Sequence, residues 1–157
     1  MAAMNQQLVT SLQQLPAPGM VEAVAMGVGY SAEQLADPSA VAVVGFHLLQ
    51  TDTLCAAYVI TPHALTLVEA TSDARSFTLT VPLNRIRRVA RFEDRQSTRV
   101  VIELDADKST TVAQAQDDGT VTETTTPAGY ELAEWDPTMR RSLQRLQIAL
   151  SNVLNRT

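Results

Sequence analysis

Apolar residues recur at helical spacing near both ends of the chain. Near the amino terminus, a stripe of Met4, Leu8, Leu12 and Leu15 with Gln and Asn between them predicts an amphipathic helix over residues 4–15. Near the carboxyl terminus, Asp136 as N-cap and Pro137 at the first helical position predict a helix over residues 137–155. Its apolar stripe is expected to be buried and consists of Met139, Leu143, Leu146, Leu150 and Val153.

Helix-breaking residues divide the segment that follows the first helix. Pro16 and the Pro18-Gly19 pair end that helix, and the apolar segment 20–30 predicts a second one. Ser31-Ala32-Glu33-Gln34 has the pattern of a capping box, which predicts a very short third helix. We therefore expect residues 1–39 to form an N-terminal helical extension.

From residue 40 the pattern changes to the short apolar runs and two-residue alternation typical of strands. The continuous apolar run 40–49 predicts a buried strand, and a bend near Asn84 is expected to lead into a strand that ends near Phe92. Thr61-Pro62-His63 and Asp117-Asp118-Gly119 are typical of hairpin turns. Further strands are predicted over residues 55–61, 64–70, 77–83, 99–104, 110–116, 120–126 and 130–135. The expected fold class is α+β, with antiparallel strands followed by the helix at 137–155.

Length and composition are those of one globular domain. The chain has 157 residues, of which 45% are hydrophobic and only 4% aromatic, so the core must be mainly aliphatic. The single cysteine, Cys55, lies between apolar neighbours and is expected to be a small core residue. No basic residue precedes Arg75, and the longest apolar run has ten residues, whereas a membrane-spanning helix needs about 20. We therefore expect a soluble, cytoplasmic protein without a transmembrane segment.

Charge is distributed in blocks along the chain, whose net charge is −5. Residues 1–70 carry five acids and no Lys or Arg, whereas residues 76–102 carry six arginines against two acids. Residues 103–136 carry nine acids against Lys108, and the tail from residue 137 carries four arginines and no acid. An acidic chain argues against nucleic-acid binding, which needs a dominant basic surface. The blocks are instead suited to self-association.

The segments 58–67, with sequence YVITPHALTL, and 81–89, with sequence VPLNRIRRV, are similar to motifs of the pleckstrin-homology-like (PH-like) superfold. The order of strands and helix over residues 40–157 resembles the bacterial PH-like and GRAM-type domains of that superfold. The resemblance implies a split β-barrel capped by the helix at 137–155. The chain departs from the family pattern at Ala64, where a basic residue is usual, and its first hairpin lacks a basic cluster. The loop with which some PH domains hold inositol phosphates is therefore not expected here.

No residue pattern predicts a catalytic, cofactor or metal site. His47 lies in an apolar run and its spacing to Asp52, Cys55 and His63 matches no zinc or triad signature, so a structural or surface role is expected. The Asp105-x-Asp107 pair lacks the later ligands of a calcium loop. We expect no cofactor, and the protein is not predicted to be an enzyme.

An arginine cluster is the feature that stands out most: Arg85, Arg87, Arg88, Arg91, Arg95 and Arg99. It could bind an anionic headgroup, a phosphate or an acidic partner, because the guanidinium group favours bidentate contacts with such groups. The favoured interpretation is a solvated strand face paired with Glu93, Asp94 and Glu103, where each exposed pair contributes about 0–1 kcal/mol.

Three functions are compatible with these patterns. The first is a non-catalytic protein-interaction module that presents a sheet edge or a helix groove to a partner. The second is a structural subunit of a larger assembly, such as a phage particle or a bacterial complex. Here the stripe Met4, Leu8, Leu12 and Leu15 is expected to dock on another molecule rather than on its own domain. The third is binding of anionic lipid or phosphate through the arginine-rich strand, against which the net negative charge argues.

Overall fold

The computed structural model describes residues 2–17, 19–71, 76–105, 111–115, 121–125 and 129–156. Its helices are α1 (Ala2–Gln13), α2 (Met20–Val28), α3 (Ala32–Leu35) and α4 (Pro137–Asn155). The strands of its first sheet are β1 (Gly45–Gln50), β2 (Leu54–Ile60), β3 (Ala64–Thr71) and β4 (Ser76–Pro82). The second sheet contains β5 (Ile86–Glu93), β6 (Thr98–Leu104) and β9 (Gly129–Glu134). A separate hairpin consists of β7 (Thr111–Ala115) and β8 (Val121–Thr125).

All strand pairs within the described residues are antiparallel. The first sheet has the order β1-β2-β3-β4 and the second the order β5-β6-β9, with a 3-10 turn at Leu83–Arg85 between β4 and β5. The α+β class and the bend near Asn84 are therefore confirmed. The two sheets are not closed into a barrel, so the split β-barrel that the resemblance implies is not confirmed. The turn predicted at Asp117-Asp118-Gly119 lies outside the described residues.

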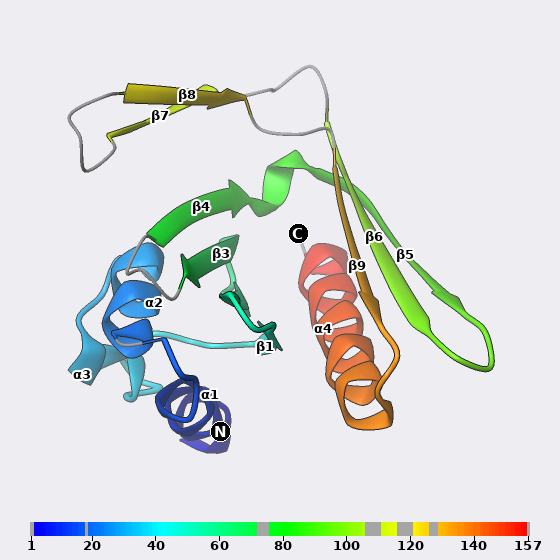
Figure 1. The fold of residues 1–157 in the computed structure, drawn as a ribbon, viewed down its shortest axis with the longest axis horizontal. Helices are drawn as coiled ribbons and strands as arrows, with labels where there is room; N and C mark the ends of the chain where they lie inside the picture. Colours follow the sequence, from blue (N-terminus) through cyan, green and yellow to red (C-terminus); the bar gives the residue numbers. More distant parts are fainter. Residues whose placement is uncertain are drawn as a thin grey trace.

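The first sheet separates two hydrophobic cores (Figure 1). Alternate residues of β2 point to opposite faces, as the period of a strand requires. Cys55, Ala57 and Val59 belong to the core under α1, α2 and α3. Ile60, on the other face, belongs to the core between the sheets and α4. The sheet is therefore buried on both faces.

Helix α4 follows its sequence pattern closely. Its N-cap Asp136 accepts hydrogen bonds from the backbone amides of Thr138 and Met139, at 3.0 and 3.1 Å. The helix runs to Asn155, as predicted. Four of the five predicted stripe residues are buried: Leu143, Leu146, Leu150 and Val153.

The stripe of α1 is buried within its own chain, which corrects the expectation that it docks on another molecule. Leu8 and Leu12 are 0% and 1% exposed, and Met4 and Leu15 pack partly buried against the same core. The side chain of Asn5, also buried, donates hydrogen bonds to the carbonyl of Leu35 at 2.7 Å and to a second carbonyl in the same loop. A 12-residue helix is marginal alone, and packing against a sheet face offers its stripe an intramolecular partner.

The apolar run 40–49 is only partly a strand, because β1 begins at Gly45. The amide of Val41 bonds to the carbonyl of Asp37, and the carbonyl of Val41 accepts from Asn5. The backbone around Val41 is thus held by a turn and a side chain, and contact with β2 begins at Val44, whose amide donates to the carbonyl of Ile60. Val41 and Val43 are buried in the core under the N-terminal helices. Their apolar character reflects this burial, which sequence alone cannot distinguish from that of a strand.

Candidate functional site

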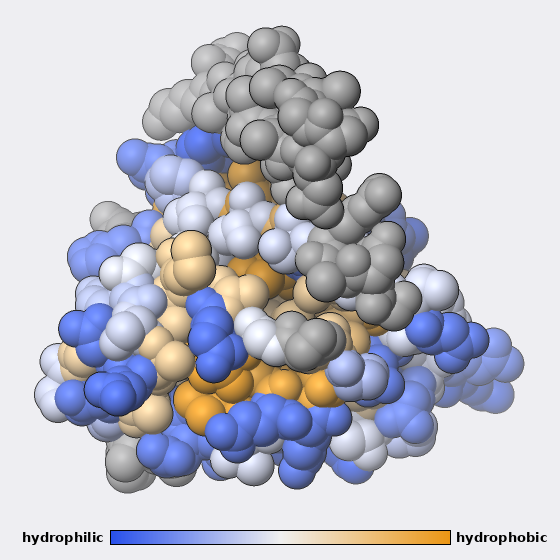
Figure 2. Space-filling model, turned by 60° about the vertical axis from the view of Figure 1, so that its left-hand side comes forward, coloured by the Kyte–Doolittle hydropathy of each residue, from blue (hydrophilic) through white to orange (hydrophobic). Residues whose placement is uncertain are grey.

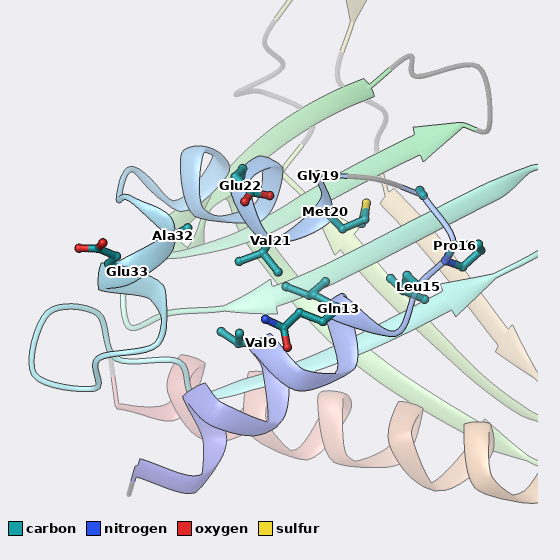
Figure 3. A pocket seen from close by; sticks show the side chains of 12 residues that line it. Val9, Gln13, Leu15, Pro16, Gly19, Met20, Val21, Glu22, Ala32 and Glu33 are labelled. Carbon is teal, nitrogen blue, oxygen red and sulfur yellow. The ribbon is translucent and has the colours of Figure 1, made fainter.

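The N-terminal helices enclose a cleft of about 450 Å³, here called the helical cleft (Figure 3). In Figure 3, Val21 points from α2 toward α1, and Gln13 of α1 extends into the space between them. Figure 2 turns this side of the molecule forward and shows an apolar patch bordered by hydrophilic residues. The cleft is lined by Val9, Leu12, Gln13, Leu15, Pro16, Ala17, Gly19, Met20, Val21, Glu22, Ala32 and Glu33.

Local sequence signals shape this cleft. The connection from α1 to α2 ends at Gly19, whose φ of 74° is a left-handed conformation that favours glycine. The capping box predicted at Ser31 is present, with reciprocal hydrogen bonds between Ser31 and Gln34 that start α3 beside α2. These turns place α1 on one side of the cleft and α2 with α3 on the other (Figure 3).

The charge at the helical cleft is exclusively acidic. Its two ionisable lining residues are Glu22 and Glu33, both exposed. The first 70 residues contain no Lys or Arg that could neutralise them. An apolar floor with carboxylates at its border is suited to an apolar segment that carries basic residues.

A second depression, here called the edge groove, lies between α1 and α4 beside β1 and has a volume of about 480 Å³. Within the described residues β1 is an edge strand of its sheet, and such strands can pair with an added strand. The groove is lined by Met4, Gln7, Thr10, Ser11, Gln14, Val44, Gly45, Phe46, Ser142, Arg145 and Ala149.

A buried polar junction lies next to the edge groove and was not predicted from sequence. His47 of β1 is fully buried, and its Nδ1 lies 2.9 Å from the hydroxyl oxygen of Ser142 on α4. Its Nε2 lies 3.3 Å from Oε1 of Glu134, at the end of β9. The imidazole thereby links both sheets and the terminal helix. Glu134 and Ser142 lie 87 and 95 positions from His47 along the chain, so sequence spacing gave no signal for the junction.

Electrostatics at this junction favour a neutral imidazole. Burial lowers the pKa of His47 to about 4, whereas burial first and the charge of Asp136 second raise the pKa of Glu134. With Nε2 protonated, His47 donates to Glu134, and Nδ1 accepts from the hydroxyl of Ser142. This tautomer satisfies every polar atom of the ring.

The junction has the residue types of a hydrolytic triad, but its surroundings favour a structural role. Ser142 is the sixth residue of α4, and only about the first four amides of a helix are free to stabilise an oxyanion. Two of the free amides, those of Thr138 and Met139, are already capped by Asp136. The geometry is therefore that of a buried hydrogen-bond network that connects β1, β9 and α4.

The structure does not bring the six candidate arginines into one site. Arg85 is only 6% exposed and turns into the interior, whereas Arg87 and Arg95 are exposed. Arg88 pairs across strands with Glu103 at 2.7 Å and Arg99 pairs with Glu131 at 3.3 Å. Arg91 lies 3.7 Å from Glu93. Arg99 also stacks on the half-exposed ring of Phe92, 4.8 Å from its centroid. This arrangement favours the solvated, paired strand face.

A different arginine organises this end of the second sheet. Arg140 of α4 donates to the hydroxyl of Thr98 at 3.1 Å and to the carbonyls of Asp94 and Arg95 at 3.0 and 3.3 Å. It fastens the start of α4 to the β5–β6 turn. In the sequence it is one of several arginines on a helix face, so nothing singled it out.

The remaining candidate residues, Cys55 and His63, lie in different environments. Cys55 is 3% exposed and belongs to the core, as expected. His63 is exposed in the turn between β2 and β3. Among the described residues, no group of three or more His, Cys, Asp or Glu side chains could hold a metal ion. Within the same residues, no helix is both long and apolar enough to cross a membrane.

Fold and surfaces together define an α+β protein with two antiparallel sheets, a terminal helix and two side-chain-lined depressions next to α1. Comparison of the chain with models of protein families, with curated proteins and with solved structures finds no match.

Proposed function

We propose that this protein is a non-catalytic protein-interaction module that binds a segment of a partner in the helical cleft. The observation that carries the proposal is an apolar cleft of about 450 Å³ whose only charged lining residues are Glu22 and Glu33. A helix or loop of a partner with an apolar anchor and flanking Lys or Arg would bury the anchor against Val9 and Val21. We propose that it does so in the cytoplasm.

The element order supports, as part of the proposal, a PH-like arrangement. Four strands of one sheet are followed by three of a second sheet and by a terminal helix packed against both. Such a scaffold holds binding surfaces on rigid elements and needs no catalytic group. Fold alone specifies no ligand, so the function is argued from the cleft.

The sheet edge is the second candidate, favoured by the position of the edge groove beside β1. An extended segment could pair with β1 between α1 and α4. Arg145 is the only charged lining residue of this groove, so an acidic segment would fit it. The two candidates therefore differ in the charge of the partner that each prefers.

Selection from a displayed library of random peptides against the full-length protein tests the proposal. We expect enriched peptides with apolar residues at helical spacing and with Lys or Arg beside them. Counter-selection against Val21→Asp should remove these peptides, because a carboxylate would enter the apolar wall of the cleft.

The matched control is Phe46→Asp, which places the same charge in the edge groove. If the peptides are lost only with Phe46→Asp, and the enriched sequences are acidic and extended, the binding site is the sheet edge and not the helical cleft. Absence of any enrichment, with both variants folded as judged by circular dichroism, would contradict an interaction module of either kind.

A further inference from the structure

The outward face of α4 carries an exposed basic stripe. Arg141, Arg145, Ile148 and Asn152 follow one another at spacings of four, three and four residues, so they lie on one side of the helix. All four are exposed, and Ile148 is 49% exposed although it is a large apolar residue. We refer to these four residues as the outer stripe of α4. The opposite side of the helix fills the core between the sheets.

The charge of this region has one sign. Residues 137–157 carry four arginines and no acidic residue. Of these arginines, Arg140 is engaged by the β5–β6 turn. An exposed apolar side chain flanked by guanidinium groups is the composition found at the centre of protein interfaces, where Arg is enriched.

The helical cleft and the outer stripe are complementary in chemistry. The cleft offers an apolar floor bordered by Glu22 and Glu33, and the stripe offers Ile148 as an anchor with Arg141 and Arg145 on one side of it. Complementary charges at a border guide association and fix its orientation.

The two surfaces cannot meet within one molecule. Helices α1, α2 and α3 share a core with one face of the first sheet, whereas α4 belongs to the core on the other face (Figure 1). A contact between them must therefore join two copies. Because it joins two different surfaces, it is heterologous, and it generates a ring or an open chain of copies rather than a simple two-fold dimer.

We propose that the outer stripe of α4 is the segment that the helical cleft binds, so that copies of this chain associate head to tail. The proposal rests on the proposed function of the cleft and names the partner. Ile148 enters the apolar part of the cleft, and Arg141 and Arg145 face Glu22 and Glu33 of the neighbouring copy. A structural subunit of an assembly requires an interface of this kind.

Charge reversal of each surface, followed by sedimentation velocity over a concentration series at low salt, tests this contact. The cleft variant carries Glu22→Arg and Glu33→Arg, and the helix variant carries Arg141→Glu and Arg145→Glu. We expect the wild type to form species larger than the monomer. Each variant alone should associate at least about tenfold more weakly than the wild type, because its cleft and its outer stripe then carry charges of the same sign and repel each other. Salt should weaken the wild-type association, because exposed charges are screened.

An equimolar mixture of the two variants provides the decisive measurement. The basic cleft of one variant then meets the acidic helix of the other, and the remaining pair of surfaces is also complementary, so association should return. Arg87→Glu with Arg95→Glu is the control, since it makes the same charge change as the helix variant at exposed positions of β5 and of the β5–β6 turn and should associate like the wild type.

A wild type that stays monomeric up to its solubility limit would overturn the proposal. So would association that survives reversal of the cleft, or variants that do not associate when mixed. The peptide selection separates this failure from that of the proposed function: cleft-specific peptides without self-association would mean that the cleft binds another protein. Failure of both experiments would remove the cleft as a binding site.

Discussion

At the scale of single residues, polar side chains that are fully or partly buried connect parts of the chain that are remote in sequence. His47 joins β1 to Ser142 on α4 and to Glu134 on β9, and Arg140 joins α4 to the β5–β6 turn. The fully buried imidazole of His47 in particular would be costly to bury without its partners. Their hydrogen bonds therefore help to fix how α4 lies on the two sheets.

The buried imidazole makes stability dependent on acid. The pKa of His47 is about 4 in the folded protein and near 6.5 in the unfolded chain. The unfolded state therefore binds the extra proton first, and stability is lost as the pH falls from about 6.5 to about 4. The difference between these two pKa values corresponds to a total loss of stability on the order of 3 kcal/mol. Urea denaturation at several pH values should show this loss.

The variant His47→Gln keeps a hydrogen-bonding side chain but cannot titrate. Its stability should be lower at neutral pH and should not fall in the same way between pH 6.5 and 4. The raised pKa of Glu134 acts in the opposite direction, because the folded state then binds a proton more readily as the pH falls. Equal pH profiles for wild type and His47→Gln would show that His47 is not buried as a neutral ring.

At the scale of elements, two glycines allow helices to approach the first sheet closely. A Cβ atom at Gly27 of α2 would lie 3.0 Å from methyl groups of Thr66 and Thr78. A Cβ atom at Gly45 of β1 would lie 2.7 Å from Cβ of Ala149 on α4. The absence of a side chain at these positions sets the spacing of the helix and sheet layers.

The contact between β1 and α4 can be tested by a double-mutant cycle. Gly45→Ala should destabilise the protein by about 1–3 kcal/mol, because its methyl group would overlap that of Ala149. Ala149→Gly should cost about 1 kcal/mol through helix propensity. The double variant should cost less than the sum, since the glycine at 149 makes room for the new methyl group. Additive free energies of unfolding from urea denaturation would rule out this contact.

At the scale of the whole molecule, the first sheet is shared by two cores. The core under the N-terminal helices combines residues of α1, such as Leu8, with residues of β2 and β3, such as Val59 and Val68. The second core combines both sheets with α4. Residues 1–39 thus supply one entire layer of the fold.

This arrangement predicts the outcome of removing residues 1–17. The truncated chain should lose its cooperative unfolding transition or show a greatly lowered midpoint, because the parts of the N-terminal core that α1 covers would become exposed. As a smaller perturbation, Leu12→Ala in the full chain should cost about 2–5 kcal/mol, whereas Gln13→Ala, at an exposed position, should cost little. Thermal unfolding followed by circular dichroism measures both. A truncated chain that unfolds like the full protein would show that α1 contributes no stability.

The sequence by itself determined the local elements of this protein. Periodicity and caps fixed α4 from Asp136 onward, the capping box at Ser31 fixed α3, and alternation fixed the buried residues of β6, Val100, Ile102 and Leu104. These signals are local, because they depend on side chains within one or two turns or on neighbouring positions of a strand. The burial of the one cysteine, Cys55, was likewise predicted from its apolar neighbours in the sequence.

Only the tertiary structure decided where these elements meet. It placed the stripe of α1 on its own sheet, kept residues 41–44 out of β1, distributed the six arginines over several surfaces and joined His47 to Glu134 and Ser142. An apolar stripe or a polar side chain specifies that it needs a partner, but not which one. The choice depends on the combined free energy of all contacts in the folded chain, and no short stretch of sequence contains that sum.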